Sequence, residues 1–178
     1  MSKDVIGSAM VVGGGIAGMQ AALDLADSGY YVYLVEKGSS IGGAMAPLDK
    51  TFPTNDCAMW IISPKLVEVG RHLNINLITC AEVDKVEGTE GNFKVTVNKT
   101  PRYIDLDKCT SCGDCVEVCP VSLPSEYDQG FIERKATYKK YAQAIPGAFA
   151  IQKADQAPCR LACPAGLNVQ GYVQMVGQ

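Results

Sequence analysis

Apolar and polar positions follow two different periods in the first forty residues. The run Ser8–Val12 is short and apolar, as is typical of a buried strand. Apolar residues then recur at helical spacing over 16–26, and Gly29 follows as a candidate C-terminal cap. Residues 30–37 return to a strand pattern that has Glu36 at its carboxyl end. The order strand, glycine turn, helix, strand predicts a βαβ unit.

The pattern is less regular in the next sixty residues. Glycine, proline and serine interrupt every period over 36–61, which predicts a long loop, and a structureless loop of this length is usually functional. Ser63 as N-cap and Pro64 at the first helical position predict a short helix that ends near Arg71. Residues 75–83 and 92–98 are expected to be strands of a hairpin or small meander, separated by a glycine-marked turn.

Three parts follow from these patterns. We predict an α/β nucleotide-binding part over 1–100 and a ferredoxin-like segment over 101–130. The extension over 131–178 shows little core-forming periodicity until a helix near 168–176. With 178 residues, the chain can hold one ordinary domain or two small ones, and an incomplete flavoprotein domain is expected.

Composition and charge exclude several functional classes. The net charge is -3, and lysine and arginine form no run longer than a pair, so no surface for nucleic acid is expected. No stretch reaches the roughly 18 consecutive apolar residues of a membrane-spanning helix, and no signal peptide is recognisable. These features predict a cytoplasmic protein that is not an integral membrane protein.

The glycine turn carries the first candidate chemistry. Gly13, Gly15 and Gly18 form the pattern G-x-G-x-x-G between strand and helix. In this context the first glycine permits the tight turn, the second lets the backbone approach a pyrophosphate, and the third allows close packing of helix on strand. Glu36 at the end of the next strand can accept hydrogen bonds from both ribose hydroxyls. The alternative is a glycine-rich turn with a surface glutamate.

The choice between FAD and NAD depends on the loop after the second strand. A carboxylate at Glu36 favours an unphosphorylated adenosine ribose, which both cofactors have. The stretch 39–46 resembles the second glycine-rich stretch of two-dinucleotide-binding flavoproteins, and it therefore favours FAD. Lys37, Gly42 and Gly43 are further candidate cofactor-binding residues.

Four cysteines near residue 110 carry the second candidate chemistry. Cys109, Cys112, Cys115 and Cys119 follow the spacing C-x2-C-x2-C-x3-C-P of bacterial ferredoxins, which ligate [4Fe–4S] clusters. A zinc site is the alternative, but it typically uses two C-x2-C pairs separated by a longer loop.

The fourth cysteine raises the question of a second cluster. In two-cluster ferredoxins the cysteine before the proline ligates the other cluster. We therefore predict that Cys163, in a second Cys-Pro pair, joins Cys109, Cys112 and Cys115 on one cubane, while Cys119 faces a second site with Cys159. Two cubanes need eight thiolates, and these motifs hold six. At least one cluster is expected, and the second stays open, because Cys119 can also close the first.

Three further residues receive weaker assignments. Cys80 lies in a strand pattern and is expected to be a buried apolar residue. Cys57 lies in the long loop, where a redox or ligand role and a plain structural role are equally compatible with the sequence. His72 is expected at a helix C-terminus, without a functional role.

The chain resembles the A-subunit family of heterodisulfide reductase, which is found in methanogens and many anaerobic bacteria. The resemblance rests on the flavin fingerprint, on KTFPTNDCAM and SPKLVEVGRH, and on the cysteine motif, in that order. It implies an FAD domain of the thioredoxin reductase type with a ferredoxin-like insert, in which FAD splits electron pairs or passes electrons singly to clusters. It also implies partners, either B- and C-like, hydrogenase or dehydrogenase subunits, or the remainder of the flavin domain. Trp60 stands where the family usually has a second cysteine.

The last segment resembles a different group of proteins. APCRLACPAGLNVQGYV is similar to the iron–sulfur region of the small subunit of glutamate synthase, and to that of dihydropyrimidine dehydrogenase. There a C-x2-C pair precedes the segment, whereas Ile151 and Ala154 occupy those places here. The function expected from the two resemblances is flavin- and iron–sulfur-dependent electron transfer. The alternatives are a ferredoxin-like docking module without flavin and half of an NAD-dependent reductase.

Overall fold

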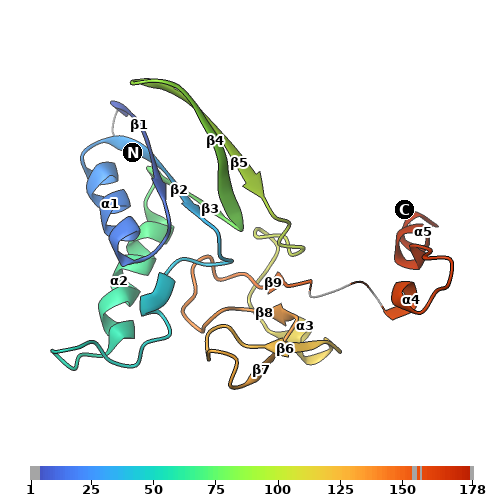
Figure 1. The fold of residues 1–178 in the computed structure, drawn as a ribbon. Coiled ribbons are helices and arrows are strands. Elements are labelled where there is room, and N and C mark those ends of the chain that lie inside the picture. Colours follow the sequence, from blue (N-terminus) through green and yellow to red (C-terminus); the bar gives the residue numbers. More distant parts are fainter. Residues whose placement is uncertain (1–4, 154–155, 157, 177–178) are drawn as a thin grey trace.

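The N-terminal part is built on a parallel sheet, as the βαβ pattern predicts. The computed structural model describes residues 5–153, 156 and 158–176. Three strands are hydrogen-bonded in parallel in the order β1, β2, β3, and two helices cover one face of the sheet (Figure 1). The elements are β1 (Gly7–Val12), α1 (Ile16–Asp27), β2 (Tyr30–Glu36), α2 (Ala58–Arg71) and β3 (Ile75–Thr79).

The core lies between this sheet and the two helices. Helical spacing puts the apolar residues of each helix on one stripe, and that stripe faces the sheet. On β2, Val32 and Leu34 point to the helices, and both are fully buried. The buried helix residues are Met19, Ala22, Leu23 and Ala26 of α1 and Ala58, Ile62, Leu66 and Val69 of α2.

The second helix begins earlier than the sequence suggests. The prediction of an N-cap at Ser63 is wrong, because α2 begins at Ala58 with Cys57 as its N-cap and contains Pro64. The proline cannot donate a hydrogen bond to the carbonyl of Trp60, which costs stability. The buried stripe from Ala58 to Val69 continues through the proline, and its packing keeps the helix intact.

The strand predicted over 75–83 is two strands. Cys80 adopts a left-handed backbone with φ 55°, which ends β3 and starts β4 (Ala81–Thr89) in a new direction. β4 pairs antiparallel with β5 (Asn92–Lys99), so the predicted hairpin is confirmed with longer strands and a shorter turn. The hairpin lies over the face of the sheet opposite the helices, and a groove of about 870 Å³ separates the two.

The residues after 100 form short elements around the cysteine segment. They are α3 (Asp114–Glu117), β6 (Ser122–Pro124), β7 (Glu133–Lys135), β8 (Thr137–Tyr138) and β9 (Ala150–Ile151). The extension contributes to the core although it shows little core-forming periodicity. Tyr141 and Ala144 are buried in the same cluster as the α1 and α2 stripes. Both residues lie in irregular chain, where no periodicity marks them.

Two helices lie in the last part of the extension. They are α4 (Pro158–Leu161) and α5 (Val169–Val176), and α5 confirms the helix predicted near 168–176. They stand apart from the rest of the chain (Figure 1). In the described part of the chain, no helix is long and apolar enough to cross a membrane.

The α2 stripe gives a matched test of this packing. Val69 is 1% exposed and Val67 is 43% exposed, on the same helix. We expect Val69→Ala to lower the free energy of unfolding by about 1.5–3 kcal/mol, because it removes buried methyl groups and leaves a cavity. Val67→Ala should change it by less than about 0.5 kcal/mol. Urea unfolding followed by circular dichroism measures both, and equal losses would contradict this assignment of the core.

Candidate functional site

Glu36 links the two loops that leave the sheet at its carboxyl edge. The residue ends β2 and is half-buried. Its Oε2 accepts a hydrogen bond from the amide of Gly14 at 2.6 Å, and its Oε1 accepts one from the amide of Gly38 at 2.7 Å. A carboxylate offers about four acceptor positions, so each oxygen retains one for a ligand. The carboxylate can therefore hold the turn in place and still accept ribose hydroxyls.

The first glycine turn has the geometry that dinucleotide binding requires. Gly13 has φ 98°, and its amide donates to the carbonyl of Val35 at 2.7 Å, which fixes the turn to β2. A Cβ on Gly18 would lie 1.8 Å from the carbonyl oxygen of Gly13, so only glycine fits there. A Cβ on Gly15 would meet nothing within 4 Å. The space beside Gly15 is open in front of the α1 N-terminus, where free amides favour an anion.

The second glycine stretch docks directly on the first. The amide of Gly42 donates to the carbonyl of Gly14 at 2.7 Å. A Cβ on Gly43 would lie 2.9 Å from the Cα of Gly15, so the two backbones touch. Gly42 and Gly43 both have positive φ and flank the start of the 3-10 turn η1 (Gly43–Met45). The sequence-predicted residues Gly13, Gly15, Gly18, Glu36, Gly42 and Gly43 thus gather at one edge of the sheet.

Gly14 and Lys37 differ from what the motif alone predicts. Gly14 is a variable position of G-x-G-x-x-G, yet a Cβ there would lie 2.3 Å from Cγ2 of Ile41 and 3.1 Å from Oε2 of Glu36. Its signal in the sequence is the run of three glycines. Lys37 is exposed and pairs with Glu82 at 2.8 Å, and the hydrogen bond to Glu82 raises the pKa of Lys37.

The cysteine segment curls through two left-handed residues. Ser111 has φ 61° and Gly113 has φ 97°, on either side of Cys112. Cys115 lies on α3, Cys112 is exposed, and Cys109 and Cys115 are half-buried. Left-handed residues turn successive amides toward one side of a loop, which favours an anionic group such as a cluster with its thiolates. The segment holds as many cysteines as a [4Fe–4S] cluster has thiolate ligands, and which of them ligate it stays a prediction.

Cys119 and Cys163 each lie beside backbone hydrogen-bond donors of their own surroundings. The amide of Thr137 is the largest of several hydrogen-bond donors that lower the pKa of the Cys119 thiol to about 7. The amides of Leu167 and Ala165 likewise lower the pKa of the Cys163 thiol. The side chain of Cys159 lies outside the described residues. Among those described, no three cysteine, histidine or acidic side chains converge on the position of a single ion.

Cys57 and Cys80 both lie at the boundary of a helix or strand. Cys57 is half-buried at the N-cap of α2 and pairs with Lys50 in an isolated β-bridge. Cys80 is half-buried, not buried as predicted, because its left-handed backbone ends the strand. Its amide donates to the carbonyl of Gly38 at 2.9 Å, and its carbonyl accepts from Thr100 at 2.7 Å.

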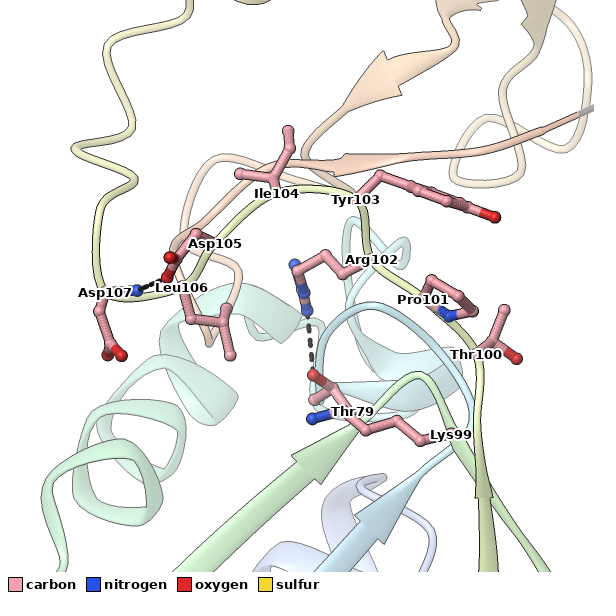
Figure 2. A pocket seen from close by; sticks show the side chains of 10 residues that line it. All are labelled: Thr79, Lys99, Thr100, Pro101, Arg102, Tyr103, Ile104, Asp105, Leu106 and Asp107. Atoms are coloured by element: carbon pink, nitrogen blue, oxygen red, sulfur yellow. Dashed lines mark hydrogen bonds between the residues drawn. The ribbon is translucent and has the colours of Figure 1, made fainter. Parts of the chain in front are cut away.

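Arg102 is the residue at this edge that the sequence does not reveal. It is buried, and Nη2 donates to Oγ1 of Thr79 at 3.0 Å and also to the carbonyl of Ser39 (Figure 2 shows the Thr79 bond). Nη1 donates to the carbonyls of Ala148 at 2.9 Å and Phe149 at 3.2 Å. The guanidinium therefore connects the sheet, the loop after β2 and the extension. Its only sequence signal is its place in PRY, directly before the cysteine segment.

Two family models match the chain. Residues 11–64 match an NAD(P)-binding Rossmann-like domain, and residues 102–123 match a 4Fe-4S binding domain. The first match contains the glycine turn, Glu36 and the second glycine stretch. The second contains Cys109, Cys112, Cys115 and Cys119. The predicted Rossmann-like half followed by an iron–sulfur segment is confirmed.

Partial likenesses to solved structures are weaker. The L-proline dehydrogenase of P. horikoshii is 25% identical, covers 55% of this chain and 20% of its own, and has a TM-score of 0.43. An FAD-dependent pyridine nucleotide-disulphide oxidoreductase from Desulfovibrio vulgaris is 21% identical. Its match covers 55% of this chain and 22% of that protein's chain, with a TM-score of 0.36.

Several relatives are much more similar in sequence. The second A-type iron-sulfur subunit of the CoB–CoM heterodisulfide reductase of Methanopyrus kandleri is 57% identical, with 83% of this chain and 23% of that protein covered. The A-type iron-sulfur subunit of the Methanocaldococcus jannaschii enzyme is 55% identical, with 89% and 25% covered. The A-type subunit of the H(2):CoB-CoM heterodisulfide,ferredoxin reductase of Methanothermobacter marburgensis is 56% identical, with 86% and 23% covered. The chain thus spans about a quarter of the length of these relatives. On this similarity, the chain belongs to the A-subunit family of heterodisulfide reductase.

Proposed function

We propose that the chain is a flavin- and iron–sulfur-dependent electron-transfer component of an anaerobic redox complex. The observation that carries the proposal is the docking of the second glycine stretch on the first, beside Glu36. This edge offers a carboxylate for a ribose, helix amides for a pyrophosphate and open space at Gly15. The same chain carries the cysteine segment, and Arg102 connects the two.

FAD is the dinucleotide that this edge suits best. A carboxylate at Glu36 would repel the extra phosphate of NADP, which leaves FAD and NAD. The second glycine stretch supports FAD, because it resembles the corresponding stretch of two-dinucleotide-binding flavoproteins and here contacts Gly14 and Gly15. The runner-up is an NAD-binding half, consistent with the Rossmann-like match. Both would use the same three glycines.

The residues of the chain bind and orient the cofactors, and no side chain is assigned as acid or base. Gly13, Gly15 and Gly18 shape the turn, and Glu36 accepts the ribose hydroxyls. Cys109, Cys112 and Cys115 hold one [4Fe–4S] cluster with a fourth thiolate, and amides near the sulfurs stabilise its negative charge. When bound, the flavin exchanges electron pairs and the cluster single electrons.

The partners of the chain follow from the same proposal. Relatives are named as subunits of heterodisulfide reductases, and one name includes hydrogen and ferredoxin. We propose that the chain works in the cytoplasm with B- and C-like, hydrogenase or dehydrogenase subunits, or with a segment that completes the flavin domain. The competing proposal is a ferredoxin-like docking module without flavin. The open space at Gly15 favours the first, because a fold that binds no dinucleotide has no need of it.

A substitution at Gly15 can test ligand binding without disturbing the fold. Its φ of -74° suits alanine, and a Cβ there would meet no protein atom within 4 Å. We therefore expect Gly15→Ala to keep the melting temperature but to weaken FAD binding at least about tenfold, because the methyl group takes the place of the pyrophosphate. Gly7→Ala, at the other end of β1, has ordinary contacts and serves as control. FAD binding measured by fluorescence quenching tests this, and unchanged affinity in Gly15→Ala would contradict a dinucleotide site at this turn.

Serine variants of the cysteines test the cluster. Cys112→Ser should lower the iron content after anaerobic reconstitution, because oxygen ligates iron–sulfur clusters poorly, while Cys80→Ser should keep it. Iron content also decides the place of Cys119. If Cys119 closes the first cluster, Cys119→Ser should behave as Cys112→Ser does, and Cys163→Ser should keep the iron. If Cys163 ligates the first cluster, as we predict, Cys163→Ser should lower the iron content of that cluster, and Cys119→Ser should keep it. Full iron in Cys112→Ser would contradict the motif assignment altogether.

A further inference from the structure

Two tyrosines hold the second glycine stretch at both of its ends. We name residues 41–46 the second glycine loop. The hydroxyl of Tyr141 donates to the carbonyl of Ile41, and the hydroxyl of Tyr127 donates to the carbonyl of Ala46 at 3.0 Å. Both tyrosines lie after the cysteine segment in the sequence, and they are separated from Ala46 and Ile41 by 81 and 100 residues, respectively. The loop is thus fixed by a part of the chain that carries no glycine motif.

The tyrosine contacts are buried and mutually supported. Tyr141 is 7% exposed, and Ile41 and Ala46 are almost fully buried. The two tyrosine rings stack with centroids 5.9 Å apart. Burial raises the pKa of Tyr141 far above its ordinary value, and the neighbouring Tyr127 and Glu36 raise it further. The hydroxyl therefore remains a donor at every physiological pH. The amide of Ile41 adds a bond of 2.9 Å to the carbonyl of Ile145.

The second glycine loop packs closely against the hydroxyl of Tyr141. A Cβ on Gly42 would lie 2.5 Å from the tyrosine hydroxyl. On its other side, the amide of Gly42 donates to the carbonyl of Gly14 in the first glycine turn. The loop is therefore held between Tyr141 and the turn. Its position against Gly14 and Gly15 depends on the tyrosine.

We infer that Tyr141 and Tyr127 are positioning residues of the dinucleotide site, which the segment after the iron–sulfur motif therefore completes. The inference rests on the proposed function, because it takes the glycine turn to bind a dinucleotide. Both tyrosine hydroxyls bond to carbonyls of the loop, and through the loop they act on the glycine turn. Their effect is to keep the two glycine stretches in contact before the ligand arrives, which lowers the ordering cost of binding.

The effect is expected to be larger at the pyrophosphate end of the ligand than at the adenosine end. The loop faces the glycine turn, where the pyrophosphate is expected, whereas Glu36 holds the ribose by its own bonds to Gly14 and Gly38. Loss of a tyrosine hydroxyl should weaken binding of FAD and ADP. It should leave the much weaker binding of adenosine unchanged, because adenosine has no phosphate.

Tyr141→Phe tests the inference in the full chain with its cluster reconstituted. We expect about three- to tenfold weaker FAD binding, because one buried hydrogen bond is lost and the ring packing stays. Iron content should not change. The matched control is Tyr33→Phe, which removes the same atom from a ring that is 40% exposed on the opposite face of the sheet. Equilibrium dialysis with FAD and ADP and saturation-transfer NMR with adenosine give the affinities.

The outcomes distinguish this inference from the proposed function. If the unaltered chain binds neither FAD nor ADP, the proposed function fails and the inference with it. If the unaltered chain binds FAD and Tyr141→Phe binds it equally well, the inference alone fails. Equal losses for FAD and adenosine would show general loosening and would also overturn it. If Tyr141→Phe does not fold, Tyr127→Phe decides the question, with about two- to fivefold weaker FAD binding expected and unchanged affinity contradicting it.

Discussion

The buried guanidinium of Arg102 is the interaction on which the arrangement of the site depends. A buried charge is costly unless hydrogen bonds compensate it. Here four neutral oxygens do so, and they come from β3, the loop after β2 and the extension near residue 148. These segments are far apart in sequence and must come together before the charge is satisfied. Arg102 thereby fixes the start of the cysteine segment beside the loop that follows Glu36.

The site uses the edge of the sheet where parallel strands end. Glu36 ends β2 there, and Cys80 ends the adjacent β3. The first glycine turn leaves β1 at the same edge, so the carboxylate and the free amides of α1 face one space. The second glycine loop closes that space from the other side. A nucleotide half and the start of the iron–sulfur segment thus share a boundary at Arg102.

The parts of the fold that follow local periods could be predicted from the sequence. The βαβ unit, the position of Glu36 and the two glycine stretches themselves follow from short patterns whose physical reasons are local. The start of α2 could not, because Pro64 marks a helix start by local rules and the buried stripe overrides them. Cys80 likewise lies inside a continuous strand pattern over 75–83, and only the left-handed backbone and the change of sheet in the structure show the break.

Contacts between residues far apart in the chain could not be predicted from the sequence, for a different reason. Tyr141 contacts Ile41 over a separation of 100 residues, and Arg102 contacts Ser39 over 63, with no repeat or spacing that connects them. Gly14 is constrained by Ile41, which is distant in sequence as well. The ligand set of each cluster stays a prediction, since it depends on which cysteines meet in three dimensions around irons.

The most direct test of a combined flavin and iron–sulfur function is the visible spectrum of the anaerobically purified and reconstituted chain, with flavin and iron quantified. We expect flavin bands together with about four or about eight irons per chain, for one or two clusters. Iron without flavin would contradict the dinucleotide site and favour the docking module. Flavin without iron would contradict the cluster.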